Sequence, residues 1–258
     1  MSAEISVTAQ NGVQIIRIAR PQKKNALNGP MYRALSDAFR AGDADANVAV
    51  HVVFGSGGVF CAGNDMNDFL AVATGKADAL SETMAFLDVL PAIRKPVVAG
   101  VGGLASGIGV TMLFHFDLVY AAPSATFSTP FLNLGLVPEA GSSLLLPARI
   151  GYQRAFEMLV LGEPFSAERA RDAGFINEIV AADGLEEKVI AVAQSLAAKP
   201  PEALAMSRSL LRGDPAALAS RMGQESRQFS ERLKSAEALE AFTAFFEKRP
   251  ADFAKRKP

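Results

Sequence analysis

Two glycine-rich passages carry the first signs of chemistry in this chain. The first, Gly55-Ser-Gly-Gly-Val-Phe-Cys-Ala-Gly-Asn-Asp65, follows the apolar run AVHVVFGS, and the second, Gly100-Val-Gly-Gly-Leu-Ala-Ser-Gly-Ile-Gly109, opens a predicted helix. Glycines allow close backbone approach to a ligand, and free N–H groups at a loop or helix N-terminus attract negative charge. Together the passages predict two amide donors that stabilise a developing oxyanion. An ordinary loop is the alternative for the first passage, since loops are commonly rich in glycine.

Other polar residues favour structural roles. Gly100-x-Gly102-x-x-Ala105 could be a dinucleotide fingerprint, but residues 121–126 lack the acidic side chain that such a site needs about 20 positions on. His51 lies in a predicted strand and His115 in a predicted buried helix, and neither has a nearby partner in sequence. Cys61 is interpreted as a small buried hydrophobe. No spacing of His, Cys, Asp or Glu predicts a metal site.

Composition excludes several classes of protein. The chain has 258 residues, of which 50% are hydrophobic and 21% charged, and its formal net charge is -1. Such a chain is typical of a globular protein and gives no basis for nucleic-acid binding. The start MSAEISVTAQ does not resemble a signal peptide, one cysteine cannot form an internal disulfide, and no apolar run predicts a membrane span. We therefore expect a cytoplasmic protein.

The elements that must position the two glycine-rich passages alternate between strands and helices. The sequence predicts a hairpin turning at Asn11-Gly12 and an amphipathic helix from Asn28-Gly-Pro30 to about Gly42. Further elements are expected in this order: strand 49–56, helix 80–93, strand 96–101, buried helix 107–116 and strand 117–121. Residues from Glu186 onward predict only helices. The expected class is α/β, with a core over 1–195 and a helical region over 196–258, joined near Lys199-Pro-Pro201.

Several motifs together resemble one known family. They are Asn25-Ala-Leu-Asn28, Phe60-Cys-Ala-Gly-Asn-Asp65, the stretch 102–117, Leu134-Gly-Leu-Val-Pro-Glu-Ala-Gly141, Ala167-Glu-Arg-Ala-Arg-Asp-Ala-Gly-Phe-Ile176 and Phe245-Phe-Glu-Lys-Arg249. In this order they are similar to the enoyl-CoA hydratase/isomerase, or crotonase, superfamily. The resemblance implies a spiral of ββα units and a C-terminal helical trimerisation region. It also implies an acyl-CoA thioester as the substrate. Coenzyme A is then part of the substrate, and no separate cofactor is expected. The resemblance further implies a homotrimer, or a hexamer built as a dimer of trimers.

Position by position, the resemblance implies specific roles. The two oxyanion amides fall on Asn64 and Ile108, which act through their backbone N–H groups. The two glutamates with which hydratases of the family activate water fall on Thr111 and Phe131. Because threonine is no base near neutral pH and phenylalanine has no heteroatom, ordinary hydratase chemistry is not expected.

Glu139 lies in Leu-Val-Pro-Glu-Ala-Gly-Ser-Ser, which is similar to the catalytic motif of peroxisomal-type Δ3,Δ2-enoyl-CoA isomerases. There one carboxylate moves a proton from C2 to C4 of a 3-enoyl thioester through an enolate. Phe131, Leu132 and Leu136 are apolar and fit a site from which water is excluded. Desolvation in such a site raises the pKa of a glutamate. Alternatively, Glu139 only caps a helix after Pro138. Hydration, ring-epoxide isomerisation and non-catalytic acyl-CoA binding remain open.

The resemblance also implies contacts with coenzyme A. Lys23 or Lys24 would lie near the phosphates, where a lysine makes electrostatic sense. Asp65 is expected to support the first loop by accepting backbone hydrogen bonds. The complete set of predicted substrate contacts is Lys23, Lys24, Ala26, Ala62, Asp65, Phe131, Leu136, Phe245, Lys248 and Phe253. In the family, residues at the positions of Phe245, Lys248 and Phe253 can belong to a neighbouring subunit. Alternatively, these three residues only form an exposed helix face.

Overall fold

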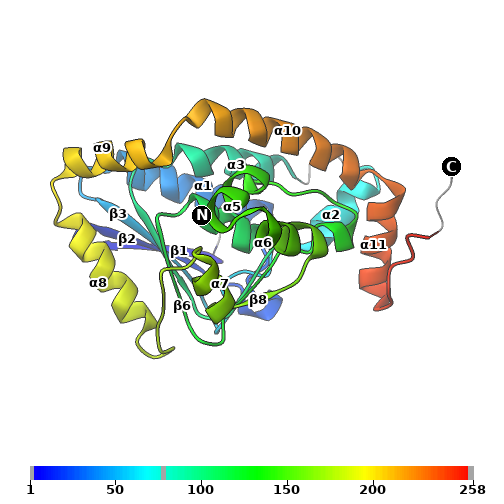
Figure 1. Cartoon of the computed structure of the whole chain (residues 1–258), viewed down its shortest axis with the longest axis horizontal. Helices are drawn as coiled ribbons and strands as arrows, with labels where there is room; N and C mark the ends of the chain where they lie inside the picture. Colours follow the sequence, from blue (N-terminus) through cyan, green and yellow to red (C-terminus); the bar gives the residue numbers. More distant parts are fainter. Residues whose placement is uncertain (1–2, 77–79, 255–258) are drawn as a thin grey trace.

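Two β-sheets organise the chain. The computed structural model describes residues 3–76 and 80–254. A six-stranded sheet has the order β1-β2-β3-β4-β6-β9, and a three-stranded sheet has the order β5-β7-β8 (Figure 1). The strands are β1 (Ile5–Gln10), β2 (Val13–Ile18), β3 (Val50–Gly55), β4 (Val97–Val101), β5 (Leu104–Ser106), β6 (Leu118–Ala121), β7 (Thr126–Ser128), β8 (Phe165–Ser166) and β9 (Glu178–Ile179). The four short strands β5, β7, β8 and β9 had no sequence signal strong enough to predict them.

Helices surround the larger sheet and extend beyond it. They are α1 (Gly29–Ala44), α2 (Met66–Ala73), α3 (Ser81–Ala92), α4 (Ile108–Thr111), α5 (Ser142–Ile150), α6 (Tyr152–Phe156), α7 (Ala167–Ala173), α8 (Leu185–Ala197), α9 (Pro201–Arg212), α10 (Pro215–Leu233) and α11 (Ala236–Glu247). The 3₁₀ segments are η1 (Pro21–Lys23), η3 (Met112–His115) and η4 (Leu132–Leu134), and η5 (Glu157–Leu161) is a π-helix. The predicted α/β class is confirmed.

The N-terminal hairpin and the first helix form as the sequence predicts. β1 and β2 pair antiparallel with Gln10 opposite Val13, so Asn11 and Gly12 make a two-residue turn with φ of 52° and 77°. Positive φ at both positions matches the strand twist, which is why Asn-Gly is favoured there. The Asn28 side chain accepts a hydrogen bond from the Met31 amide and thereby caps α1.

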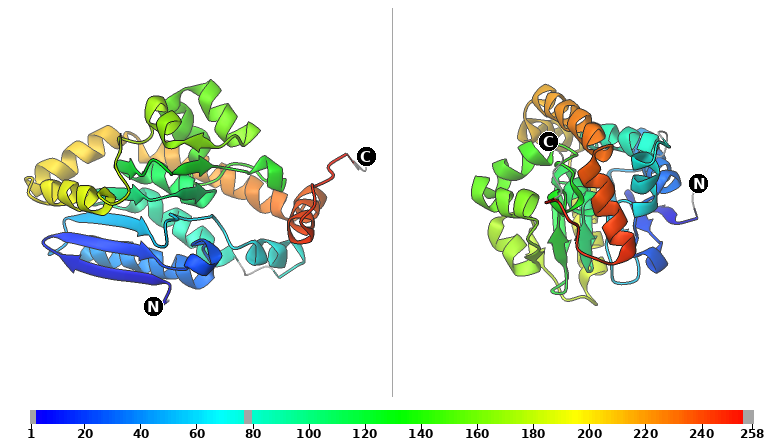
Figure 2. Two further views of the ribbon diagram at one scale, coloured as in Figure 1. Left: turned by 90° about the horizontal axis from the view of Figure 1, so that it is seen from below. Right: turned by 90° about the vertical axis from the view of Figure 1, so that its right-hand side faces the viewer.

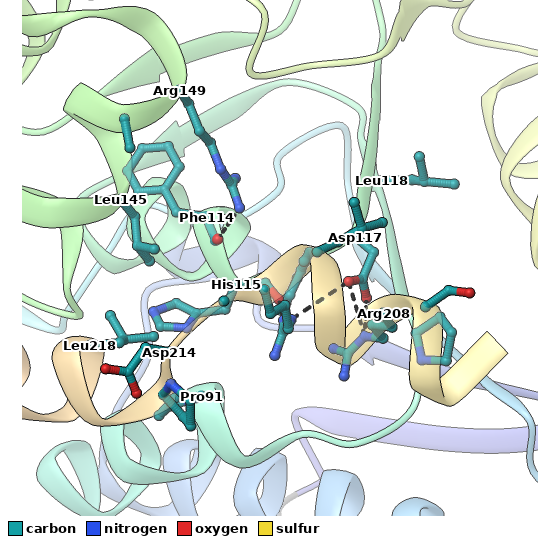
Figure 3. A pocket seen from close by; sticks show the side chains of 18 of the residues that line it. Pro91, Phe114, His115, Asp117, Leu118, Leu145, Arg149, Arg208, Asp214 and Leu218 are labelled. Carbon is teal, nitrogen blue, oxygen red and sulfur yellow. Dashed lines mark hydrogen bonds and ion pairs between the residues drawn. The ribbon is translucent and has the colours of Figure 1, made fainter. Parts of the chain in front are cut away.

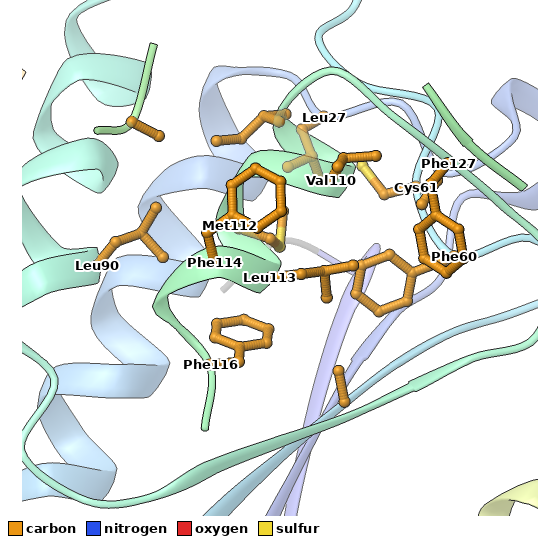
Figure 4. Close-up of a cluster of buried hydrophobic side chains, with 14 of the residues drawn as sticks. Leu27, Phe60, Cys61, Leu90, Val110, Met112, Leu113, Phe114, Phe116 and Phe127 are labelled. Carbon is orange, nitrogen blue, oxygen red and sulfur yellow. The ribbon is translucent and has the colours of Figure 1, made fainter. Parts of the chain in front are cut away.

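Parallel strands buried on both faces form the centre of the large sheet. β2 to β4, β6 and β9 run parallel, and α8 packs on one face against an apolar cluster that includes Val52, Val98 and Val189. α1 and α3 belong to the other side (Figure 2). The expected helix 107–116 is found as α4 followed directly by η3, and all eight of their residues are buried (Figure 4). This segment therefore lies inside the core, where its backbone is fixed by packing.

The C-terminal helices share the core of the rest of the chain. α8 ends at Ala197 and α9 begins at Pro201, on either side of the predicted joint. Further on, α10 and α11 contribute Phe229 and Phe242, which meet Phe69 of α2 at ring-centroid distances of 6.1 and 5.6 Å. In Figure 1, α10 runs along one side of the molecule and α11 lies beside α2. The C-terminal region thus packs directly on the elements that follow the first glycine-rich passage.

No helix in the described ranges 3–76 and 80–254 is long and apolar enough to cross a membrane. The cellular compartment stays a prediction.

One arginine joins α9 to the sheet. Arg208 is 8% exposed, and its Nε lies 2.9 and 3.0 Å from the two carboxylate oxygens of Asp117, which immediately precedes β6. Its Nη1 donates to the carbonyls of Ile93 and Arg94 at 2.7 and 2.9 Å. The ion pair stands at the wall of a cavity of about 610 Å³ between α9 and the core (Figure 3). One side chain therefore satisfies acceptors from two separate segments.

Replacing Arg208 with alanine should lower the free energy of unfolding by about 3 kcal/mol, because Asp117 loses its closest cation and the carbonyls of Ile93 and Arg94 lose a donor. Urea-induced unfolding at fixed protein concentration measures the change. Arg227→Ala, at an exposed arginine of α10, is the matched control and should change it by less than about 0.5 kcal/mol. Equal effects of the two substitutions would contradict the role assigned to Arg208.

Candidate functional site

The two glycine-rich passages lie against each other. Cys61 and Ala105 form a parallel bridge, in which the Cys61 amide donates to Leu104 O at 3.1 Å and the Ser106 amide donates to Cys61 O at 2.8 Å. A Cβ atom on Gly109 would lie 2.4 Å from Cys61 O, a distance that real Cβ atoms do not reach. Glycine is therefore required for this backbone-to-backbone contact. Phe60 and Cys61 of the first passage are buried at this contact, whereas Gly57 and Gly58 are exposed in a turn. The passage is therefore a loop whose second half packs into the core.

The amides of Asn64 and Ile108 both remain available. Leu27 donates to Gly63 O and accepts from the Asp65 amide, each at 2.8 Å, so the N–H of the intervening Asn64 faces away from Leu27. Ile108 is the first residue of α4 and has no preceding helical turn to bond. Neither amide donates to another group in the part of the chain that the structure describes. Two free donors thus project from adjoining loops.

Polar side chains fix the first loop beside Asn64. The buried Tyr32 hydroxyl donates to Asn64 Oδ1 at 2.6 Å. Asp65 accepts from the Asn67 amide at 3.0 Å, capping α2, and pairs with Arg20 Nη1 at 2.8 Å. Asp65 therefore supports the loop by accepting a backbone hydrogen bond, as expected. Tyr32 and Arg20 gave no sequence signal, because their partners are 32 and 45 residues away.

Glu139 is a buried carboxyl group, 4% exposed. Its Oε1 accepts a hydrogen bond of 2.5 Å from the Thr111 hydroxyl on α4. Burial raises the pKa of Glu139 to about 8; the nearby Glu225 carboxylate adds to the rise and the Thr111 hydrogen bond opposes it. The alternative that Glu139 caps a helix is wrong, since α5 has Gly141 at its N-cap and receives no cap from the Glu139 side chain. The group can therefore exchange protons near neutral pH.

The turn of residues 139–143, called here the Glu139 turn, has its own supports. Ala140 has φ of 57°, a left-handed conformation that is strained for a residue with a Cβ. His115 Nε2 lies 2.6 Å from Ala140 O, and because a carbonyl only accepts, this nitrogen carries the proton. Burial lowers the pKa of His115 to about 4, so the ring is neutral. His115 is structural as expected, but its contact lies next to Glu139.

The predicted coenzyme A contacts fall in two places. Near the first loop, the Ala62 amide donates to Lys24 O at 3.0 Å and Arg20 Nη1 donates to Ala26 O at 3.1 Å, which keeps this backbone together. Lys23 and Lys24 are exposed there.

At the other end, Phe245 is 55% exposed on α11 and Lys248 is the left-handed C-cap of that helix. Phe253 and Leu136 line one cavity of about 400 Å³. Phe131 and Leu136 are buried as expected, whereas Leu132 is 41% exposed and adds no dry surface within one chain. Contact of any of these residues with coenzyme A stays a prediction.

The remaining candidates are structural. Burial raises the pKa of the Cys61 thiol to about 12, which disfavours a thiolate. His51 is fully buried, with Nδ1 2.7 Å from Gln14 Oε1 and Nε2 3.1 Å from Asp43 Oδ1. The sequence did not reveal Asp43 as its partner, which comes from the last turn of α1. Among the described residues no group of three or more His, Cys, Asp and Glu side chains is arranged to hold a metal ion.

Comparison with known proteins identifies the family. The family model described as enoyl-CoA hydratase/isomerase matches residues 8–256. A rat protein named enoyl-CoA delta isomerase 2 is 33% identical over 96% of this chain, which spans 65% of that protein's length. A 2,3-dehydroadipyl-CoA hydratase from Escherichia coli K12 is 30% identical over 98% of this chain and the whole of that protein.

A crystal structure of an enoyl-CoA hydratase/isomerase from Pseudoalteromonas atlantica superposes with a TM-score of 0.89 and 35% identity, covering 97% of this chain and 99% of that one. The predicted crotonase-type fold, an α/β core of two sheets followed by a helical region, is confirmed. The relatives carry the names of both isomerases and hydratases, so their names alone do not distinguish the two reactions. The chain belongs to the enoyl-CoA hydratase/isomerase, or crotonase, family.

Proposed function

We propose that this enzyme is a Δ3,Δ2-enoyl-CoA isomerase in which Glu139 transfers the proton. The observation that carries the proposal is the buried Glu139 carboxyl group, whose pKa is about 8 and which accepts a hydrogen bond from Thr111. A carboxyl group of that pKa gives up and regains a proton near neutral pH, as a one-base isomerase requires. Acyl-CoA thioesters are the substrate class that the family implies.

The reaction needs a group that stabilises the enolate between the two proton transfers. Glu139 removes a proton from C2 of the 3-enoyl thioester, and negative charge develops on the thioester oxygen. The free amides of Asn64 and Ile108 are the proposed donors to that oxygen, and a water-poor setting strengthens such hydrogen bonds. The protonated Glu139 then returns the proton at C4.

The neighbours of Glu139 favour isomerisation over hydration. Two carboxylates orient and activate the water in hydratases of the family, and the matching positions here are Thr111 and Phe131. Thr111 donates its hydroxyl hydrogen to Glu139, and Phe131 is buried and apolar. The nearby Glu225 carboxylate accepts from the Gly141 and Ser143 amides and from the Ser143 hydroxyl, so its hydrogen bonds hold it at the start of α5.

Isotope labelling distinguishes the two reactions. The purified protein, given 3-enoyl-CoA and 2-enoyl-CoA separately in ¹⁸O-water, should convert the first into 2-enoyl-CoA with no ¹⁸O incorporated, as followed by mass spectrometry. Glu139→Gln should lower kcat by at least about 10³-fold, since the only proposed base is lost. An ¹⁸O-labelled 3-hydroxyacyl product would establish hydration instead. Binding of acyl-CoA with no turnover of either substrate would favour the non-catalytic alternative.

The activity should depend on pH through Glu139. Because the ionised carboxylate is the base, kcat should rise with pH and reach half its plateau near pH 8. Thr111→Val removes a hydrogen bond that favours the ionised form, so the midpoint should move up by about one pH unit. Steady-state kcat between pH 6 and 10 measures both values. A Thr111→Val midpoint at or below that of the wild type would refute the assigned role of this hydroxyl.

Exposed apolar side chains support the family-implied homotrimer or hexamer as a proposal. Leu210 and Leu211 of α9 are 84% and 89% exposed, and Tyr152 of α6 is 67% exposed. Large exposed apolar side chains commonly lie in interfaces between subunits. Sedimentation velocity should give three or six times the chain mass, and the double variant Leu210→Lys, Leu211→Lys should sediment as smaller species. A wild-type monomer at micromolar concentration would contradict the proposal.

A further inference from the structure

A buried glutamate from the C-terminal region reaches the Glu139 turn. Glu225 lies in the middle of α10 and is 5% exposed. Its Oε2 accepts from the Gly141 amide at 2.5 Å, and its Oε1 accepts from the Ser143 amide at 3.0 Å and the Ser143 hydroxyl at 2.5 Å. Gly141 is the N-cap and Ser143 the second residue of α5, at the end of the helix where backbone amides have no helical partner. Glu225 therefore caps α5 from 84 residues away in sequence.

The α10 helix also packs against the Glu139 turn. A Cβ atom on Gly141 would lie 2.6 Å from Leu218 and 3.2 Å from Met222, so α10 packs directly on the Gly141 backbone. On the other side of the same turn, His115 donates to Ala140 O. The Glu139 turn is thus held between η3 and α10 by hydrogen bonds to two successive residues.

The turn needs such support. A left-handed alanine costs about 1–2 kcal/mol and persists only where its surroundings impose it. Glu139 immediately precedes Ala140, and its carboxylate must lie within reach of the Thr111 hydroxyl and of any substrate that the Asn64 and Ile108 amides hold. A displacement of about 1 Å in a reacting group can lower a rate about 10²-fold.

We propose that Glu225 is a positioning residue for Glu139: its carboxylate holds the Gly141 and Ser143 amides and so fixes the base against Thr111 and the two free amides. The proposal rests on the proposed isomerase function. It makes docking of α10 a condition of catalysis, because the helical region supplies the acceptor for the turn that bears the base.

Glu225 also acts on Glu139 through its charge. The ionisable groups around the pair are Arg221 of α10, which donates to Ser143 Oγ at 3.3 Å, the neutral His115 of η3 and the phenol of Tyr32 on α1. The negative charge of Glu225 raises the pKa of Glu139, in addition to the larger effect of burial. Removing that charge should lower the pKa of Glu139, whereas loss of an exposed charge elsewhere on α10 should not.

The test compares Glu225→Gln with Glu231→Gln, a matched loss of charge at an exposed glutamate of the same helix. Glu225→Gln should lower kcat about 10- to 100-fold at high pH, leave KM for 3-enoyl-CoA within about threefold, and move the midpoint of the kcat–pH profile to lower pH. Hydrogen exchange of peptides covering residues 139–145 should accelerate in this variant alone. Glu231→Gln should match the wild type in every measurement.

Unchanged kcat and midpoint in folded Glu225→Gln would overturn the proposal, as would an equal loss in Glu231→Gln. If Glu225→Gln does not fold, Ser143→Ala removes one of the three donors and should lower kcat about two- to fivefold with faster exchange of the turn; no change in either would also overturn it. Failure of the isomerase function appears separately, as absence of wild-type turnover or full activity of Glu139→Gln, while hydrogen exchange still reports whether Glu225 fixes the turn.

Discussion

The Glu139 carboxyl group is buried, and the surrounding structure has to accommodate it. Moving its pKa from an ordinary 4.5 to about 8 corresponds to about 5 kcal/mol against the ionised form. A protein that is stable by only about 5–15 kcal/mol can accept this cost at few positions. This shift already includes the Thr111 hydrogen bond, which keeps it from being larger, and the neutral carboxyl group is the more stable form below pH 8. Burial of Glu139 therefore lowers the stability of the fold and also gives the carboxyl group a pKa at which it can exchange protons near neutral pH.

Backbone contacts provide the second half of the site. The glycine-rich passages meet through main-chain hydrogen bonds, and Gly109 allows an approach to Cys61 that any side chain would prevent. The passages follow two adjacent parallel strands, β3 and β4, so the sheet itself brings them to the same edge. The amides of Asn64 and Ile108 are consequently set by the fold, and their own side chains are free to serve other contacts, such as that of Asn64 with Tyr32.

The helical region completes this arrangement. Its α10 helix supplies Glu225 to the Glu139 turn, and its α11 helix packs on α2 through Phe242 and Phe69. The first contact joins the C-terminal part of the chain to the turn that bears Glu139. The second joins it to α2, which follows the first glycine-rich passage. Arg208 makes a third junction, immediately before β6. Site geometry and attachment of the helical region are therefore coupled through specific side chains.

Local patterns in the sequence determined a large part of this protein. Asn11-Gly12 specified the hairpin and Asn28 the start of α1, since turn and cap preferences act within a few residues. The glycine-rich passages and Glu139 were identifiable because their motifs are contiguous and resemble one family. Short strands such as β8, with two residues, carry no periodicity and could not be predicted. The partners of the candidate base came only from the tertiary structure: Thr111 is 28 residues from Glu139, and Glu225 is 84 from Gly141. Burial and hydrogen bonding between distant segments are properties of the packed chain, so only the fold decided the protonation of Glu139 and the support of its turn.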